Sequence, residues 1–386
     1  MSITIFEIQR MADYPKGDGE SMCSMYILKN LQMVDGSMVD ITISNNLIQK
    51  ITPVGSRYLC QSFDMKGLYV SSGWIDLHVH ALDTLQPYGD TIDEIGIRQG
   101  VTTIVDAGSC GAGNMEELYQ KASVSRTNVF AFLNVSTLGL TRMNELSNLD
   151  WIDEKELLEA VTRYDRFIVG LKARISSSVV LNNGIKPLII AQNLSNLSNL
   201  PLMVHIGSSP PEITAILNHL KEDDIITHFL HGKVNNLFPN NRILSELLFA
   251  LERGVHLDVG HGSASFSFPI AETAKRYGIS DFTISSDIYR DNRENGPVFS
   301  LASVATKFLY LGYSLKEVID AITIRPAKRI NKPELGMLAE GLLANLTLFS
   351  VEEELVELID SLGNVRYTDK QIKPKGVVIN GEFLVF

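Results

Sequence analysis

The sequence predicts an α/β protein, a (β/α)8 TIM barrel with a small β-sandwich domain formed from both chain ends. In the middle of the chain, short apolar runs alternate eight times with helix-like segments, which is the pattern of such a barrel. Both ends carry short β-rich runs separated by turn signals. With 386 residues, of which 45% are hydrophobic, the chain can fill a core of this size.

Eight runs are the expected barrel strands, and most are continuous apolar stretches, as parallel strands covered on both faces should be. In chain order they are "IDLHVH" (75–80), "TTIVDAG" (102–108), "NVFAFLNVS" (128–136), "IVGLKAR" (168–174), "PLMVHIG" (201–207), "IITHFL" (225–230), "VHLDVG" (255–260) and "FTISSD" (282–287). The segments between them, such as "WIDEKELLEAVTRY" and "NRILSELLFALERG", have the character of helices.

The two ends of the chain are expected to pair into the small domain. Residues 25–70 hold "MYILKNLQMV", "VDITISNNLIQKI" and "GLYV", and residues 335–386 hold "LLANLTLFSV" and "KGVVINGEFLVF", the latter with an Asn-Gly hairpin signal. The barrel is then expected at residues 71–334. Residues 1–24 are polar and lack periodicity, so they are expected to be a tail.

The charge of the chain restricts its partners. The formal net charge of −11 argues against binding to nucleic acids or to anionic membranes, because both would repel the protein. Small molecules are the expected ligands, and homo-oligomerisation is left open. The three cysteines, Cys23, Cys60 and Cys110, are too few and too scattered for a disulfide framework. Without a signal-peptide pattern or a long apolar stretch, the sequence predicts a cytoplasmic protein.

Polar residues gather where the expected strands end. His78 and His80 stand one residue apart, and side chains two positions apart on a strand project to the same face. The carboxyl ends of all eight strands meet at one face of a (β/α)8 barrel, where active sites lie. Six residues are therefore expected to converge there: His78, His80, Lys172, His205, His228 and Asp287.

These residue types suit two divalent ions. Zinc prefers imidazole and carboxylate ligands, so one ion is expected at His78, His80 and Asp287, and the other at His205 and His228. Lys172 does not suit such a site as an ammonium group, because two dications would repel it. A neutral lysine can instead react with carbon dioxide to give an anionic carbamate.

Several of these motifs resemble those of the amidohydrolase superfamily of metal-dependent hydrolases. "GWIDLHVH", "VGLKAR", "PLMVHIG", "THFLHGK" and "SSD" carry the resemblance, which covers residues from about 25 to 386. "GVTTIVDAG", "KARIS", "DVGHG" and "DIYRDNRENGPV" are similar to its amidohydrolase/deacetylase branch, which includes D-aminoacylases and acetyl-mandelate-type esterases. The resemblance implies that the Lys172 carbamate bridges the two metals. One departure is Asn345, where the superfamily usually has an aspartate.

Further contacts are expected around this centre. Arg174 lies two residues beyond Lys172, on the same face, and Arg293 follows the last strand, so either could bind a substrate carboxylate. His261 follows strand seven and is a candidate substrate contact. Cys110, in the loop after strand two, is a candidate substrate contact or a rival bridging ligand. Asp76 shares the face of His78 but lies deeper, so it is expected to orient ligands.

The expected reaction is cleavage of an amide or ester bond in a small acylated acid, either an N-acyl amino acid or an O-acyl hydroxy acid. A hydroxide shared by two zinc ions would attack the acyl carbonyl, and Asp287 would move the proton. The alternatives are a cyclic-amide hydrolase of the dihydroorotase or hydantoinase type, a mononuclear deaminase, and a catalytically silent scaffold. Ala81 and Leu82 stand where dihydroorotases place an arginine, and Lys172 argues against a deaminase.

Overall fold

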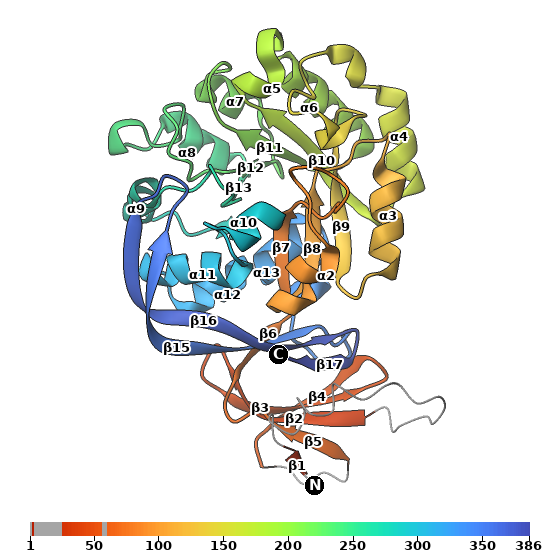
Figure 1. Ribbon diagram of the computed structural model, residues 1–386, viewed down its shortest axis with the longest axis vertical. Coiled ribbons are helices and arrows are strands. Elements are labelled where there is room, and N and C mark those ends of the chain that lie inside the picture. The colour runs from red at the N-terminus through yellow and green to blue at the C-terminus, as the bar shows by residue number, and fades with distance from the viewer. Residues whose placement is uncertain (1, 4–24, 56–59) are drawn as a thin grey trace.

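A computed structural model describes residues 2–3, 25–55 and 60–386, and it contains the predicted barrel (Figure 1). Eight parallel strands form one sheet in chain order, each paired with the next. They are β7 (Trp74–Val79), β8 (Val101–Ala107), β9 (Asn128–Asn134), β10 (Ile168–Ile175), β11 (Leu202–Ile206), β12 (Ile225–Thr227), β13 (His256–Asp258) and β14 (Phe282–Thr283). All eight strands that the sequence predicts are present.

The barrel closes between its last and first strands. Val79 forms a parallel bridge with Ile288, Asp287 N donates to His78 O (2.7 Å), and His80 N donates to Ile288 O (3.0 Å). The segment after β14 therefore lies beside the end of β7. This closure places Asp287 next to the His78 and His80 pair.

Two strands, β12 and β14, end three and four residues earlier than the sequence predicts. β12 stops at Thr227 because His228 has a left-handed backbone, with φ 69°, and Asp287, four residues after β14, has φ 52°. Residues other than glycine avoid this region because of contacts of the Cβ atom, and it is enriched at functional positions. Both residues are predicted metal ligands, so the backbone departs from a regular strand where the site is formed.

Helices cover the outside of the barrel (Figure 1). They include the four predicted from "WIDEKELLEAVTRY", "PPEITAILNHLKE", "NRILSELLFALERG" and "IAETAKRYG", which are α4, α7, α8 and α9. The helices are α2 (Ile92–Ile95), α3 (Met115–Val124), α4 (Glu154–Arg163), α5 (Ser177–Val180), α6 (Lys186–Ser198), α7 (Ile213–His219), α8 (Ser245–Glu252), α9 (Phe268–Arg276), α10 (Arg290–Glu294), α11 (Leu301–Tyr310), α12 (Leu315–Ala321) and α13 (Ile324–Arg329). Within the described residues, none of the helices has the length and apolarity that a membrane crossing requires.

Strands from both chain ends form the small β domain, which lies below the barrel in Figure 1. They are hydrogen-bonded into a single branched sheet of nine strands, and β6 pairs with β15 to join the two ends. The strands are β1 (Ser2–Ile3), β2 (Met25–Met33), β3 (Met38–Ser44), β4 (Leu47–Pro53), β5 (Gln61–Asp64), β6 (Tyr69–Ser72), β15 (Leu346–Ile359), β16 (Val365–Ile379) and β17 (Glu382–Val385). Ser2–Ile3 pairs with β5, whereas the rest of the predicted tail lies outside the described residues.

The strands β15 and β16, which form a hairpin, are longer than the other strands of the small domain. Its first part pairs with β6, and its far part runs up beside α11 to α9 (Figure 1). Phe349, Leu358 and Ile372 belong to the same hydrophobic core as the barrel helices. The hairpin therefore packs on the barrel as well as completing the small domain.

Candidate functional site

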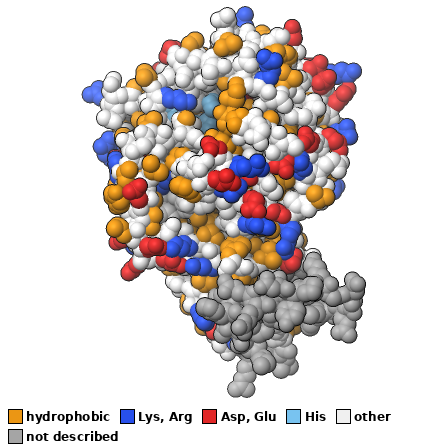
Figure 2. All heavy atoms as spheres, in the orientation of Figure 1, with side chains coloured by type: hydrophobic (Ala, Val, Ile, Leu, Met, Phe, Trp, Pro, Cys, Tyr) orange, Lys and Arg blue, Asp and Glu red, His pale blue; other side chains and the backbone are white. Residues whose placement is uncertain are grey.

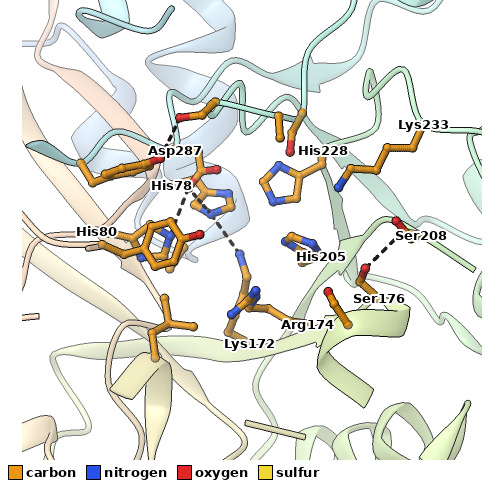
Figure 3. Close-up of a pocket in the computed structure, with 18 residues that line it drawn as sticks. His78, His80, Lys172, Arg174, Ser176, His205, Ser208, His228, Lys233 and Asp287 are labelled. Carbon is orange, nitrogen blue, oxygen red and sulfur yellow. Dashed lines mark hydrogen bonds and ion pairs between the residues drawn. The ribbon is translucent and has the colours of Figure 1, made fainter. Parts of the chain in front are cut away.

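The predicted site residues converge at the carboxyl ends of the barrel strands, around a cavity of about 200 Å³ (Figure 3). Histidine side chains are visible at the bottom of this hollow in Figure 2. The six predicted metal ligands all line the cavity, and so does Arg174. The other residues of its wall are Tyr88, Ala107, Leu140, Ser176, Ser178, Ser208, Lys233, Ser263, Ala264, Ser265 and Tyr289.

The histidines of the cavity are held in defined orientations. His228 Nδ1 bonds to Gly260 O (2.7 Å), and His80 Nδ1 bonds to Ser109 Oγ (2.9 Å). Their rings lie close together, with centroids 5.6 Å apart for His78 and His80 and 4.4 Å apart for His205 and His228. Burial, together with neighbouring positive charge, holds the pKa of His78, His205 and His228 well below the usual value. These three imidazoles are therefore neutral, as metal binding requires.

A network of hydroxyl groups sets the proton position on His78. Thr227 Oγ1 and Ser285 Oγ each donate to Asp258 Oδ2 (2.7 Å). A carboxylate can only accept, so the Thr227 hydroxyl donates its hydrogen to Asp258. The Thr227 oxygen then accepts from His78 Nδ1 (2.9 Å). His78 therefore carries its proton on Nδ1 and leaves the Nε2 lone pair free toward the cavity.

Asp287 faces the Nε2 atoms of the two histidines at the end of β7. Its Oδ1 atom lies 3.1 Å from His80 Nε2 and 3.4 Å from His78 Nε2. Ligand atoms of His78, His228 and Asp287 all lie within 4.8 Å of one another. Neutral imidazoles, whose Nδ1 atoms are occupied elsewhere, together with a carboxylate form a donor set that fits a divalent ion of the zinc type.

Lys172 lies in the middle of this donor set. Its side chain is 1% exposed, and Nζ is 3.2 Å from His78 Nε2 and 3.2 Å from Met203 Sδ. Burial lowers the pKa of Lys172 to about 7, although Asp287 and Asp258 oppose the change. About half of the lysine is thus uncharged near pH 7, in a place where an ammonium group would repel bound cations.

Asp76 lies below the cavity, as expected, but it acts on backbone and hydroxyl groups and not on imidazoles. Its carboxylate accepts from Ser286 N (3.0 Å), from Ser286 Oγ and from His78 N (3.3 Å). Burial raises the pKa of Asp76 to about 7. Through these bonds Asp76 ties the segment that carries Asp287 to strand β7.

Two cationic side chains reach the cavity wall from different elements (Figure 3). Arg174 Nη1 is 3.3 Å from Oε2 of Glu145, which is fully buried, so a carboxylate of the protein already partners this guanidinium. Lys233 follows β12 and points into the cavity. Within the described part of the chain, no carboxylate forms an ion pair with Lys233 Nζ.

Three predicted substrate contacts are not among the residues that line the cavity, which corrects their assignment. Arg293 forms two hydrogen bonds with Asp90, of 2.6 and 3.3 Å. Cys110 is fully buried in the barrel core, and burial raises the pKa of its thiol well above the usual value. His261 is fully buried and bonds to Lys307 Nζ (2.7 Å). Arg293 and His261 therefore bond to other side chains, and Cys110 packs in the core.

Sequence reasoning missed several residues of the site. Ser109, Thr227 and Asp258 orient the histidines, and Tyr88, Lys233 and Tyr289 line the cavity. Thr227 and Asp258 lie on predicted strands at positions that face inward, so their spacing is a usable signal. Lys233 lies on a loop, and no periodicity indicates where a loop side chain points.

Comparison with known proteins gives relatives over almost the whole chain. The family described as a "Deacetylase-like composite domain" matches residues 338–384. A protein of Enterococcus faecalis named "Deacetylase" is 39% identical over 360 residues, which are 92% of this chain and 98% of the relative. A deacetylase of Agrobacterium fabrum is 34% identical, covering 90% of this chain and 86% of the relative.

Two solved structures have sequence identities to this chain in the same range as these relatives. One described as an adenine deaminase has a TM-score of 0.91 at 38% identity, and one described as a dihydroorotase has a TM-score of 0.87 at 31% identity. In each case 94% of this chain and 99% of the other chain are covered. The shared architecture therefore includes both the barrel and the small β domain.

Proposed function

Because this chain belongs to the deacetylase family of the amidohydrolase superfamily, we propose that it removes the acyl group from a small acylated acid. The chain is a metal-dependent hydrolytic enzyme of carbon–nitrogen bonds. The proposed substrates are N-acyl amino acids and O-acyl hydroxy acids. The observation that supports them is the cavity itself, which holds the donor set and also Lys233, a cation that forms no ion pair with a carboxylate among the described residues.

The proposed centre holds two zinc ions. His78, His80 and Asp287 would hold one ion, and His205 and His228 the other. We assign Lys172, as a carbamate formed with carbon dioxide, to the bridging position, since Nζ lies among these ligands and its uncharged form suits the place. When bound, the ions supply the positive charge that acidifies an attacking water and polarises the acyl carbonyl.

Asp287 is the proposed proton carrier. Its carboxylate lies beside His78 and His80 and lines the cavity, so it can reach both an attacking water and the leaving group of a bound substrate. Asp287 first takes the proton of the water and then gives it to the leaving nitrogen or oxygen.

The size and charge of the cavity support a small anionic substrate. About 200 Å³ is below the usual range of ligand pockets, so a large substrate would not fit. Ser176 and Ser208 stand near Lys233 and add hydroxyl groups for a polar leaving group (Figure 3). Arg174 is the second candidate for the substrate carboxylate, although Glu145 neutralises part of its charge.

The function is tested with a panel of N-acyl amino acids of both hands and O-acyl hydroxy acids, using zinc-loaded protein. We expect release of the free acid from at least one class, and loss of this activity when a chelator removes the metal. Adenine, dihydroorotate and hydantoins belong in the same panel, because two similar structures are described as an adenine deaminase and a dihydroorotase. If the protein converted only adenine, dihydroorotate or a hydantoin, and none of the acylated acids, the proposed reaction would be wrong.

Lys233→Ala tests the carboxylate contact. We expect KM to rise about 10- to 100-fold with little change in kcat, since a hydrogen bond to a charged group contributes about 1.5–3 kcal/mol. Lys155→Ala is the matched control, because Lys155 is 85% exposed on α4. An unchanged KM for anionic substrates in Lys233→Ala would contradict the assignment.

A further inference from the structure

The loop of residues 259–267 joins β13 to α9, and its first five residues touch two proposed site residues. Gly260 O accepts from His228 Nδ1 (2.7 Å), so this loop orients the His228 ring. Gly262 has φ 52°, and a Cβ atom there would overlap the Asp287 carboxylate. His261 N and Gly262 N donate to the carbonyl oxygens of Ser285 and Ser286 (3.1 and 2.9 Å), directly before Asp287. A displacement of this loop therefore moves both His228 and Asp287.

The outer side of the loop is held by the turn of the β15–β16 hairpin, residues 360–364. Ser361 Oγ donates to Gly262 O (2.9 Å), and Phe266 N lies 3.2 Å from the same hydroxyl oxygen. Ser361 N donates to Phe266 O (3.1 Å). The hydroxyl of Ser361, which does not line the cavity, thus joins the hairpin turn to the loop.

Lys307 of α11 forms a second connection between the same elements. Its Nζ atom bonds to His261 Nε2 (2.7 Å), Ile359 O (2.7 Å) and Pro297 O (2.9 Å). A carbonyl oxygen can only accept, so His261 donates from Nδ1 to Gly262 O (2.9 Å), the carbonyl that Ser361 also binds. Burial holds the pKa of His261 well below its usual value, so its Nε2 atom carries no proton and accepts from Lys307.

The hairpin turn is itself fixed to the barrel. Asp360 is 2% exposed, and its carboxylate accepts from Phe268 N (2.9 Å) at the start of α9 and from Asn364 N (2.8 Å). Arg366 Nε is 2.8 Å from Glu272 Oε1 on α9. The turn is thus a rigid support and not a free end of the hairpin.

We propose that the hairpin turn of the small β domain is a positioning element of the active site, with Ser361 as the positioning residue. From outside the barrel, Ser361 holds Gly262 and so fixes the loop that orients His228 and keeps Asp287 in place. The proposal rests on the proposed function for the roles of His228 and Asp287. It assigns a part in catalysis to a segment that does not line the cavity.

The test compares Ser361→Ala with Ser361→Thr, which keeps a hydroxyl group, and with Ser350→Ala. Ser350 lies on the same hairpin, where its hydroxyl bonds to Glu352 (3.0 Å), so this variant controls for a general effect on the hairpin. Two quantities are measured well below the melting temperature: zinc affinity by competition with a chelator, and kcat and KM on the best substrate of the panel.

We expect Ser361→Ala to lower kcat about tenfold and to weaken zinc binding about three- to tenfold, with KM nearly unchanged. Ser361→Thr should recover most of both losses, and Ser350→Ala should match the unchanged protein. Equal kcat and zinc affinity in Ser361→Ala and Ser350→Ala would overturn the proposal. If no panel compound is hydrolysed, the proposed function fails, and the zinc measurement alone still decides whether Ser361 positions the site.

Discussion

Asp287→Asn is expected to keep its fold and to lose about two to four decades of turnover, the usual contribution of a general acid or base. The amide has nearly the shape of the carboxylate, so the backbone bonds that close the barrel at Asp287 and Ile288 remain. The asparagine amide cannot take a proton from water, and it is a weaker metal ligand than the carboxylate. The measurements are kcat on the best substrate and metal content by elemental analysis.

Asp291→Asn is the matched control for this variant. Asp291 lies four residues further along, is exposed, and bonds to Asn295 (2.8 Å), so the same change of charge occurs outside the cavity. Near-normal turnover in Asp287→Asn would remove Asp287 from the mechanism. Loss of activity in both variants would instead indicate a general effect of charge near the cavity.

The barrel could be predicted because its signal is periodic. Eight buried runs alternate with helices, so each inward-facing residue at the carboxyl end of a strand must lie at the same face of the barrel. His78, Lys172, His205 and Asp287 can therefore be placed at one cavity from the sequence alone. The exact end of a strand cannot be predicted in this way. β12 stops at Thr227, since the left-handed backbone of His228 ends the extended conformation.

Loop side chains could not be placed in the same way. Arg293 and Lys233 both follow strands and both are cations, yet Arg293 pairs with Asp90 and Lys233 faces the cavity. Asp90 and Arg293 are 203 residues apart, and no local pattern indicates that they meet. The far part of the β15–β16 hairpin was missed as well, because residues 352–374 are strongly charged and lack the apolar runs that predict buried strands.

Lys172→Ala is expected to lose one of the two metal ions and, with it, at least about a hundredfold of the activity. The proposed carbamate would be an anion shared by two cations, so without it each cation would lose a ligand and the two would repel each other more strongly. A direct ligand should matter at least as much as the groups that orient ligands, whose loss costs about 10- to 100-fold. Metal stoichiometry and turnover are measured together on the same preparation.

Chemical rescue separates the bridging anion from other effects of the substitution. The alanine variant leaves a space where the lysine side chain stood, beside His78 and Met203. Propionate or acetate at high concentration can enter this space and supply two carboxylate oxygens, so partial recovery of activity and of the second ion is expected. Acetamide has a similar size but no charge, and it should restore neither.

Cys110→Ala completes the comparison, because Cys110 is the rival bridging ligand. Its thiol is fully buried in the barrel core and does not line the cavity, so this variant should keep both ions and most of its rate. A thiol with a raised pKa is also a poor source of thiolate for a metal. If Cys110→Ala lost the metal while Lys172→Ala kept two ions and normal turnover, the bridge would be the cysteine and the carbamate would be excluded.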